Sequence, residues 1–421
     1  MKIYIRAFMS ALLLCLSMWA SYPLSAEEKG LDAYFEFGRK GATSLVEEED
    51  LSDEFNYSKY TLKYSGVCGD SSSYNAKYQY YNKGYDTLEN LDNMFNMAGL
   101  GIDTPLYSTG DFSIKTGPDF EFKEKIYSDA PESNYDQIKF DLPIAFKKKD
   151  DWAVKLSGGI NSYHYPEAAK DQLKLNSKLE TSKKLFDERM DISAFYKFQW
   201  VDREKTADRI ERTIGAALGL DVGSPFVKKI EGGFERGMDN TIIYEEREDS
   251  FDYKYLNWFV KTKHAISNRI KSSVKYTNLA RDYADFNHNY GGFILENDWD
   301  LRVFEVKDNV LDLKLGYLHK QYRYPYVSNP FAFHNNNIYS GAELARKDDW
   351  KVTLDSEVRI YDYPARRTND KIYYIEHFGI EKFLFKKVLV AGFDYKYTFK
   401  NFLHKPDITE DVFRFHVNYK F

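Results

Sequence analysis

Residues 388–399 read VLVAGFDYKYTF, and apolar and polar side chains alternate along them. The apolar set consists of Leu389, Ala391, Phe393, Tyr395, Tyr397 and Phe399, and the polar set consists of Asp394, Lys396 and Thr398. Successive side chains of a β-strand point to opposite faces. The stretch therefore predicts a strand with one apolar face and one polar face.

The same alternation recurs along the chain, for example at 138–146, 190–200 and 311–317. A tilted strand needs about ten residues to cross a bilayer, whereas a membrane helix needs ~20 consecutive apolar residues. After Ala26 no stretch approaches that helical length. Any segment of this chain that crosses a membrane is therefore expected to be a strand.

The first residues are typical of an exported chain. Lys2 and Arg6 precede an apolar run, and Ala26 is the small residue that a signal peptidase requires at its cut site. We expect residues 1–26 to be a cleaved signal peptide. Residues 27–421 are then expected to form a single domain.

Composition argues against a nucleic-acid partner and against an intrachain disulfide. Removing Lys2 and Arg6 changes the formal charge from -6 to -8, because two positive charges are lost. An acidic surface of this kind has no general affinity for nucleic acid. Cys68 is the one cysteine that follows the predicted signal peptide, so no intrachain disulfide is expected.

Turn signals divide the chain into pairs of strands. Compact polar connections occur at 148–151, 183–188, 221–225, 267–269, 307–309, 347–349 and 386–387. Longer polar segments lie between them, at 163–170, 202–208, 236–252, 282–289, 323–337, 362–370 and 400–410. Short turns on one side and longer loops on the other are typical of outer-membrane barrels.

A repeated stretch supports this interpretation. Residues 148–166 and 346–364 share K-D-D-W-x-V-x-L and a closing Y-x-Y-P. Each copy begins at a predicted turn and ends at a predicted loop, so each predicts one membrane-crossing strand. Tyr163 and Tyr361 differ in parity from the tryptophan of their copy, so they point inward unless a β-bulge intervenes. Convergence on common turn chemistry and descent from a duplicated half both explain the similarity, and the faint similarity elsewhere favours convergence.

Aromatic residues near strand ends predict anchoring at the membrane interfaces. The expected girdle residues are Trp152, Trp350, Trp200 and Tyr317. The last strand, 413–421, alternates strictly and ends on phenylalanine. In this it resembles the Gram-negative outer-membrane β-barrels, the porins and their relatives. The resemblance implies that Tyr419 and Phe421 belong to a signal read by the outer-membrane assembly machinery.

These patterns predict an all-β fold, a closed antiparallel transmembrane β-barrel in an outer membrane, with lipid around it. Fourteen strands are expected from Lys148 onward, and six more precede it at 32–37, 56–66, 74–82, 97–106, 111–123 and 135–146. The count is therefore twenty. The weakness of the segments at 32–37 and 97–106 leaves eighteen as the alternative, and no feature distinguishes a monomer from an oligomer.

The polar face of each strand predicts a lumen lined by more bases than acids. The expected lumen-facing bases are Lys139, Lys155, Lys197, Lys271, Lys275, Lys314, Lys351, Arg359, Lys396 and Arg414. Fixed charges in a pore select the sign of permeating solutes. This predicts a porin for passive diffusion of small polar or anionic solutes or oligosaccharides, unless the bases pair with acids on neighbouring strands.

The loop richest in proline, asparagine and aromatic residues, 323–337, is a candidate for contact with sugars. Its expected contact residues are Tyr326, Phe331, Phe333 and His334. An ordinary structured loop would have the same composition.

Two other functions remain possible interpretations of a barrel sequence. The first is export of a polysaccharide or other product with a periplasmic partner. The second is an enzyme, but the scattered histidines show no metal-binding spacing and no catalytic motif is present. We therefore expect no catalytic residue, no metal and no cofactor.

Overall fold

The computed structural model describes twelve segments of the chain. They comprise residues 30–44, 55–68, 72–85, 92–128, 130–167, 170–203, 208–242, 252–283, 289–324, 332–385, 387–403 and 406–420. Within them the regular structure is β-strand apart from two short 3-10 helices, η2 (Pro131–Ser133) and η5 (Arg367–Asn369). No helix in these segments is long and apolar enough to span a membrane.

The strands follow one another through the described segments, from Gly30 to Lys420. Their bounds are β1 Gly30–Ser44, β2 Phe55–Cys68, β3 Ser72–Tyr85, β4 Asn93–Ser108, β5 Phe112–Thr116, β6 Asp119–Tyr127, β7 Tyr135–Lys148, β8 Trp152–His164, β9 Gln172–Leu185, β10 Met190–Arg203, β11 Asp208–Asp221, β12 Val227–Ile242, β13 Tyr253–Ala265, β14 Ile270–Tyr283, β15 Tyr290–Val306, β16 Asn309–Arg323, β17 Phe333–Arg346, β18 Trp350–Asp362, β19 Lys371–Leu384, β20 Leu389–Phe402 and β21 Ile408–Lys420. Every pairing between them is antiparallel. The fold is all-β, as predicted.

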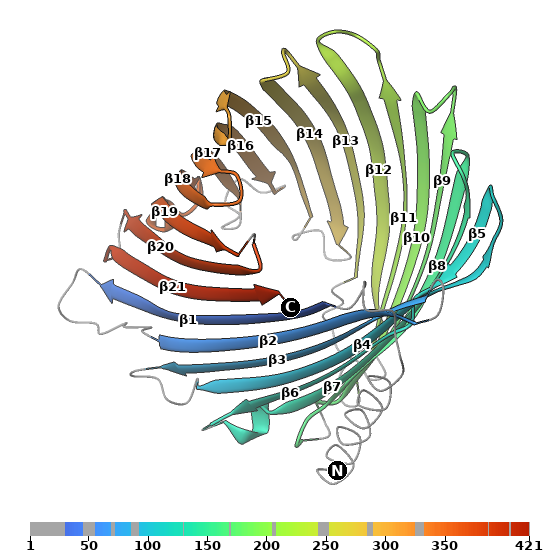
Figure 1. The fold of residues 1–421 in the computed structure, drawn as a ribbon, viewed down its shortest axis with the longest axis horizontal. Helices are drawn as coiled ribbons and strands as arrows, with labels where there is room; N and C mark the ends of the chain where they lie inside the picture. Colours follow the sequence, from blue (N-terminus) through green and yellow to red (C-terminus); the bar gives the residue numbers. More distant parts are fainter. Residues whose placement is uncertain are drawn as a thin grey trace.

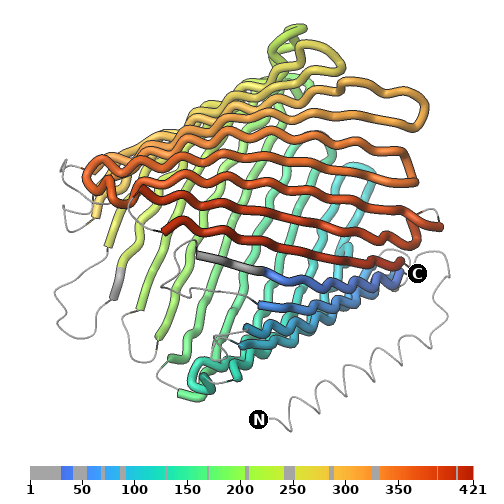
Figure 2. The backbone as a smooth tube through the Cα atoms, turned by 90° about the vertical axis from the view of Figure 1, so that its left-hand side faces the viewer, coloured from blue at the N-terminus to red at the C-terminus, as the bar shows by residue number. Residues whose placement is uncertain are grey.

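The sheet closes on itself into a barrel around a central opening (Figure 1). β1 pairs with β2 on one side and with β21 on the other, so the first and last strands lie side by side (Figure 2). Closure matters because it leaves no unpaired edge and satisfies the backbone hydrogen bonds that lipid cannot.

Twenty strand positions surround the opening. β5 and β6 both pair with β4 and both pair with β7, so together they fill one position. They are separated at Gly117 and Pro118, and Pro118 has no backbone N–H to continue the ladder. Twenty-one strands therefore make a twenty-stranded barrel, and the predicted count of twenty is confirmed.

The two ends of the barrel differ as predicted. At the turn end, compact turns join β7 to β8, β9 to β10 and each later pair up to β19 and β20. Neighbouring turns also touch: Lys387 lies 2.7 Å from Asp348, and this hydrogen bond lowers the pKa of the Asp348 carboxyl. The predicted loop at 323–337 is too long, because β17 begins at Phe333. Phe333 and His334 therefore belong to a strand.

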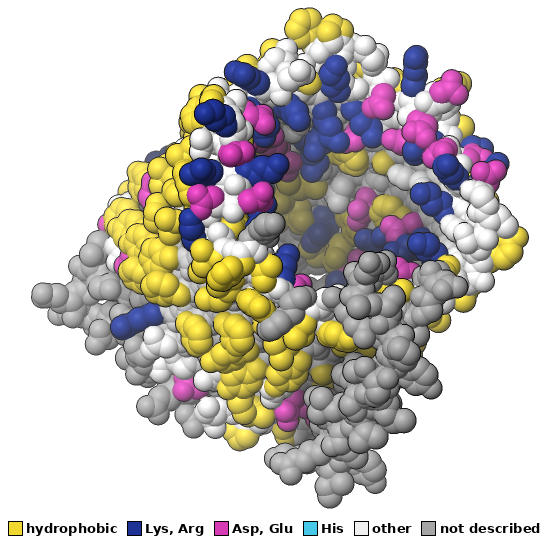
Figure 3. Space-filling model, viewed as in Figure 1, with side chains coloured by type: hydrophobic (Ala, Val, Ile, Leu, Met, Phe, Trp, Pro, Cys, Tyr) yellow, Lys and Arg dark blue, Asp and Glu magenta, His cyan; other side chains and the backbone are white. Residues whose placement is uncertain are grey.

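The two faces of the barrel wall have opposite chemistry. Large apolar side chains stay exposed on the outside, including Leu156 at 48%, Leu354 at 53% and Phe415 at 58%. Lysine, arginine, aspartate and glutamate instead gather around the central hollow (Figure 3). An apolar outer wall is costly in water and favourable in lipid. The outer wall is thus suited to lipid rather than to water.

The repeated stretch forms β8 and β18, which occupy equivalent places in two hairpins. Their pairing with β7 and β17 is continuous, without a bulge at 158–159 or at 356–357. Tyr163 and Tyr361 consequently point toward the lumen. Trp152 and Trp350, which begin the two strands, lie on the outer face.

Candidate functional site

The inner wall is built by strand register, which places alternate residues of each strand toward the lumen. All ten lysines and arginines predicted to face the lumen lie opposite the apolar outer face. Three features line this wall: a network of paired charges at mid-height, a recess lined by lysines and a collar of aromatic rings at the loop end. Each is described below from its contacts.

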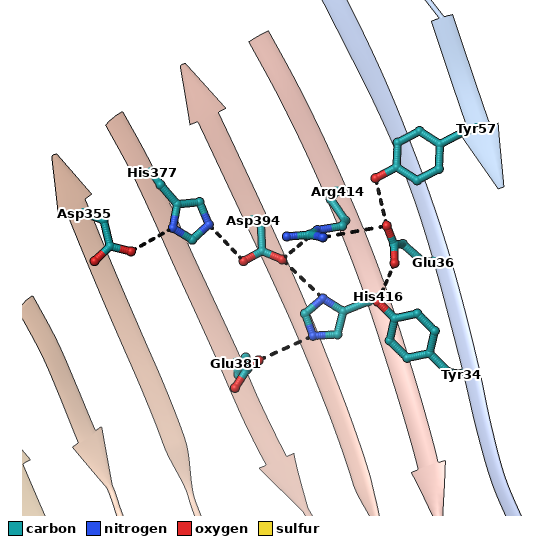
Figure 4. A network of polar contacts seen from close by, with 9 residues as sticks. All are labelled: Tyr34, Glu36, Tyr57, Asp355, His377, Glu381, Asp394, Arg414 and His416. Atoms are coloured by element: carbon teal, nitrogen blue, oxygen red, sulfur yellow. Dashed lines mark hydrogen bonds and ion pairs between the residues drawn. The ribbon is translucent and has the colours of Figure 1, made fainter. Parts of the chain in front are cut away.

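The histidine network crosses the seam where the barrel closes (Figure 4). We define it as Glu36, Asp355, His377, Glu381, Asp394, Arg414 and His416. These residues come from β18, β19, β20, β21 and β1. Because β1 is the first strand and β21 is the last, the network joins the two ends of the sheet.

Asp394 is the centre of the network. Its carboxylate lies 3.1 Å from Nε of Arg414, 3.3 Å from Nε2 of His377 and 3.4 Å from Nδ1 of His416. Glu36 is buried, at 7% exposure, and accepts hydrogen bonds from the hydroxyls of Tyr34 (2.5 Å) and Tyr57 (3.0 Å). Each carboxylate thus has several donors, which compensates for its partial removal from water.

Five of the ten predicted bases form ion pairs with carboxylates. The pairs are Lys139–Asp141 at 2.6 Å, Lys275–Glu296 at 3.5 Å, Lys351–Glu381 at 2.9 Å, Arg359–Glu357 at 2.7 Å and Arg414–Asp394 at 3.1 Å. These five bases are therefore balanced locally by acids, which lie on the same strand for Lys139 and Arg359 and on a neighbouring strand for the other three. The sequence predicted that bases outnumber acids on the wall unless they pair with acids, and these five do pair.

The other five predicted bases have different surroundings. Lys197 lies over the ring of Phe195 at 5.2 Å. Lys271 and Lys314 line one recess with Asp300 and Asp312, while Lys155 lines another recess, and Lys396 stands opposite His377 in the β19–β20 register.

The lysine recess lies on β1, β2, β3 and β21 and has a volume of about 280 Å³. It is lined by Lys59, Lys63 and Lys77, with Tyr34, Thr61, Gln79, Asn418 and Asp32. Lys63 and Lys77 are direct cross-strand neighbours. Like charges placed opposite one another destabilise a sheet, so this arrangement is poorly explained by stability alone.

The aromatic collar is a chain of ring contacts on the inner wall at the loop end. Register places its rings inward, and we define it as Phe55, Tyr57, Tyr81, Tyr85, Phe95, Tyr135, Tyr163, Tyr253, Tyr283, Tyr290, Tyr322, Phe333, Tyr361, Tyr363, Tyr373 and Phe402. The contacts form separate runs, on β13 and β14, from β15 to the end of β18, from β18 to β20, from β2 to β4, and on β7 and β8. On the intervening β11 and β12 the wall carries an Arg209–Asp239 pair instead.

Cations lie against the collar rings. Lys83 is 3.7 Å from the Phe55 centroid, Lys123 is 4.9 Å from Phe95, and Lys174 is 4.8 Å from Tyr163. On the other arc, Arg281 is 4.5 Å from Tyr253 and Lys371 is 5.1 Å from Tyr361. Within the part of the chain that the structure describes, none of these five cations forms an ion pair with a carboxylate.

The residues predicted to contact sugars do not act together. Phe333 faces the lumen and joins the collar, with its ring 4.8 Å from Tyr322. His334 lies on the outer face of β17, with Nε2 3.5 Å from Nε2 of Gln321, so it cannot line the lumen. Tyr326 and Phe331 lie outside the described residues.

The predicted girdle residues all lie on the outer face. Trp152 and Trp350 begin β8 and β18 at the turn end, and Trp200 is near the loop end of β10. Tyr317 lies midway along β16, where its hydroxyl donates to Asn336, so its position does not suit an interfacial anchor. Tyr419 pairs with β1 and β20 at the turn end, and Phe421 lies outside the described residues.

Sequence reasoning missed the lysine recess and most of the collar. The alternation Tyr57-Ser58-Lys59-Tyr60-Thr61-Leu62-Lys63 could have identified the inward lysines of β2. The collar could have been found as aromatic residues on the same parity as the lumen lysines. Aromatics of the lipid-facing girdle would have the opposite parity.

Comparisons with known proteins identify the fold. No family model matches the chain, and no curated protein matches it. Similar solved structures include the copper transporter OprC (TM-score 0.57, 7% identity, 93% of this chain and 80% of that one) and the unliganded ferric citrate transporter FecA (TM-score 0.54, 10% identity, 94% and 79%). OccAB4 of Acinetobacter baumannii is also similar (TM-score 0.50, 13% identity, 94% and 99%).

The chain has the fold of an outer-membrane β-barrel. Identities of 7–13% establish that fold and leave the specific family open.

Proposed function

We propose that the protein is an outer-membrane channel through which small polar solutes diffuse, with a preference for anions. The lysine recess carries this proposal. Three ammonium groups and one carboxylate, that of Asp32, line about 280 Å³ on the lumen wall. A solute anion passing this wall would compensate the repulsion between Lys63 and Lys77.

The ion pairs of the wall agree with this proposal. Paired charges there contribute little net potential, so the excess cations of the recess and collar would decide the sign of the solute. Two of the similar structures are transporters by name, which favours transport over catalysis. Among the described residues no group of three or more histidines, cysteines or carboxylates could hold a metal ion.

Single-channel recording in planar bilayers tests the proposal. We expect open steps and a reversal potential in a KCl gradient that indicates anion preference. A double variant, Lys63→Glu with Lys77→Glu, should reduce or reverse that preference. The matched control is a double variant that makes the same charge change outside the lumen. Its first substitution is Lys254→Glu, on the outer face of β13.

Three outcomes would count against a passive anion channel. Cation preference of the unmodified barrel would contradict the proposed preference for anions. An unchanged reversal potential in the double variant would exclude the recess as its source. A folded barrel that never conducts would instead favour export with a periplasmic partner.

A further inference from the structure

The aromatic collar needs an explanation that membrane anchoring does not supply. Girdle aromatics of barrels face lipid, whereas the collar rings face the lumen. The adjacent pair Tyr373 and Tyr374 on β19 makes the contrast clear. Tyr373 faces inward and contacts Tyr361 and Phe402, while Tyr374 is 43% exposed on the outer face and stacks on Phe399.

Within its longest runs the collar forms a continuous surface of rings rather than isolated contacts. On β15 to β18, the centroid of Tyr290 is 5.5 Å from Tyr322, that of Tyr322 is 4.8 Å from Phe333, and that of Phe333 is 5.8 Å from Tyr363. A small anion would contact one such ring at a time. Only an extended ligand with apolar faces would use a track of this length.

The collar cations differ from those at mid-height in their partners. Lys371 lies between three rings, 5.1 Å from Tyr361, 6.0 Å from Tyr363 and 5.4 Å from Tyr373. An ammonium group on a ring face is held by cation–π attraction and keeps hydrogen-bond donors for another group. A carboxylate is the natural acceptor for these donors.

We propose that the collar is a binding site for acidic oligosaccharides, of the uronic acid class, at the loop end of the barrel. The apolar face of each sugar ring packs on a collar ring, and the carboxylates bind to Lys371, Arg281, Lys83, Lys123 and Lys174. The hydroxyls of the tyrosines bond to those of the sugar. This inference deepens the proposed channel function by naming its substrate class.

The arrangement favours a carbohydrate over an acidic peptide. Most collar rings are tyrosines, which combine an apolar face with a hydroxyl and suit a ligand that has both on every unit. The longest runs of rings also follow the circumference of the wall, so a ligand enters from the loop end and lies across several strands before it moves inward.

Blocking of single-channel current measures binding to the collar. Tri-galacturonate, maltotriose and tri-glutamate are added in turn on the loop side of the full-length protein in planar bilayers. We expect tri-galacturonate to interrupt the current reversibly, and the two comparison ligands to do so at least tenfold more weakly. Tyr373→Leu should weaken the block by tri-galacturonate about tenfold.

Matched variants separate stacking from charge. Tyr374→Leu removes the neighbouring outward ring and should leave the block unchanged. Tyr80→Leu and Tyr81→Leu form a second such pair, because Tyr80 contacts Tyr60 outside and Tyr81 contacts Phe95 inside. Lys371→Gln should weaken block by tri-galacturonate several-fold and leave the weaker block by maltotriose unchanged.

Equal block by tri-glutamate and tri-galacturonate, unaffected by Tyr373→Leu, would overturn the inference and reduce the collar to fixed positive charge. Absence of block in a conducting channel would also overturn it, while leaving the channel function intact. Failure of the channel function can be told apart from failure of binding. If the barrel never conducts, calorimetric titration of the detergent-solubilised protein with tri-galacturonate still measures binding at the collar.

Discussion

The middle and the loop end of the inner wall use the same residue types for different purposes. At mid-height, cations such as Arg414 and Lys275 are held against carboxylates on neighbouring strands. At the loop end, cations such as Lys371 and Arg281 are held against aromatic rings. A carboxylate partner neutralises a cation, whereas a ring positions it and leaves its charge available. The middle is therefore suited to holding the barrel together and the loop end to binding.

The largest effect that would test this contrast is the loss of Asp394. In Asp394→Ala, the partners Arg414, His377 and His416 lose their common acceptor at the seam of the barrel. We expect the variant to lose about 2 kcal/mol of unfolding free energy, less than for a fully buried pair because the Arg414 side chain is 41% exposed. Denaturant unfolding in lipid vesicles, followed by tryptophan fluorescence, measures the loss.

The matched variant at the loop end is Lys371→Ala. It removes a charge without leaving a carboxylate unpaired among the described residues, so its stability should change by about 0.5 kcal/mol or less. Equal losses in Asp394→Ala and Lys371→Ala would break the distinction between the two regions.

An effect smaller than that of Asp394→Ala is expected where the two regions meet. Glu410 on β21 binds Lys400 at 2.6 Å and Lys40 at 3.2 Å, and both lysines also lie by collar rings, Tyr373 and Phe55. Glu410→Gln removes the carboxylate and leaves both cations available to a ligand. We expect tri-galacturonate to bind about threefold more tightly, or roughly 0.6 kcal/mol.

Block of single-channel current measures that gain, and maltotriose is the control because it carries no charge. A gain for both ligands would indicate a change in pore width. Weaker block by tri-galacturonate would mean that Glu410 orients the two lysines in the collar.

The sequence predicted the barrel far better than it predicted the site. Alternation along segments such as 388–399 and compact turns such as 148–151 repeat over the chain, so strand number, order and closure follow from local pattern. Whether Lys351 is paired depends on Glu381, which lies on the next strand at a register that sequence does not reveal. The pairing of the lumen bases therefore could not be predicted from the sequence.

The local sequence pattern also gave a wrong prediction at the beginning of β17. The polarity of 333–337 favoured a loop, yet these residues form the beginning of β17. Phe333 and His334 then point to opposite faces because they are adjacent in a strand. Composition grouped the two residues, and strand geometry separates them.

The smallest effect concerns the edge of the histidine network. Asp355 on β18 contacts Nδ1 of His377 at 3.2 Å, and its side chain is 56% exposed, in contrast to 18% for Asp394. Because water solvates most of this carboxylate, Asp355→Asn should cost about 0.5 kcal/mol or less in the same unfolding experiment. A graded loss, large at Asp394 and small at Asp355, would mean that the seam is stabilised by the number of partners each carboxylate holds. A loss at Asp355 as large as that at Asp394 would mean that the network acts as one cooperative unit, in which removing any member releases the rest.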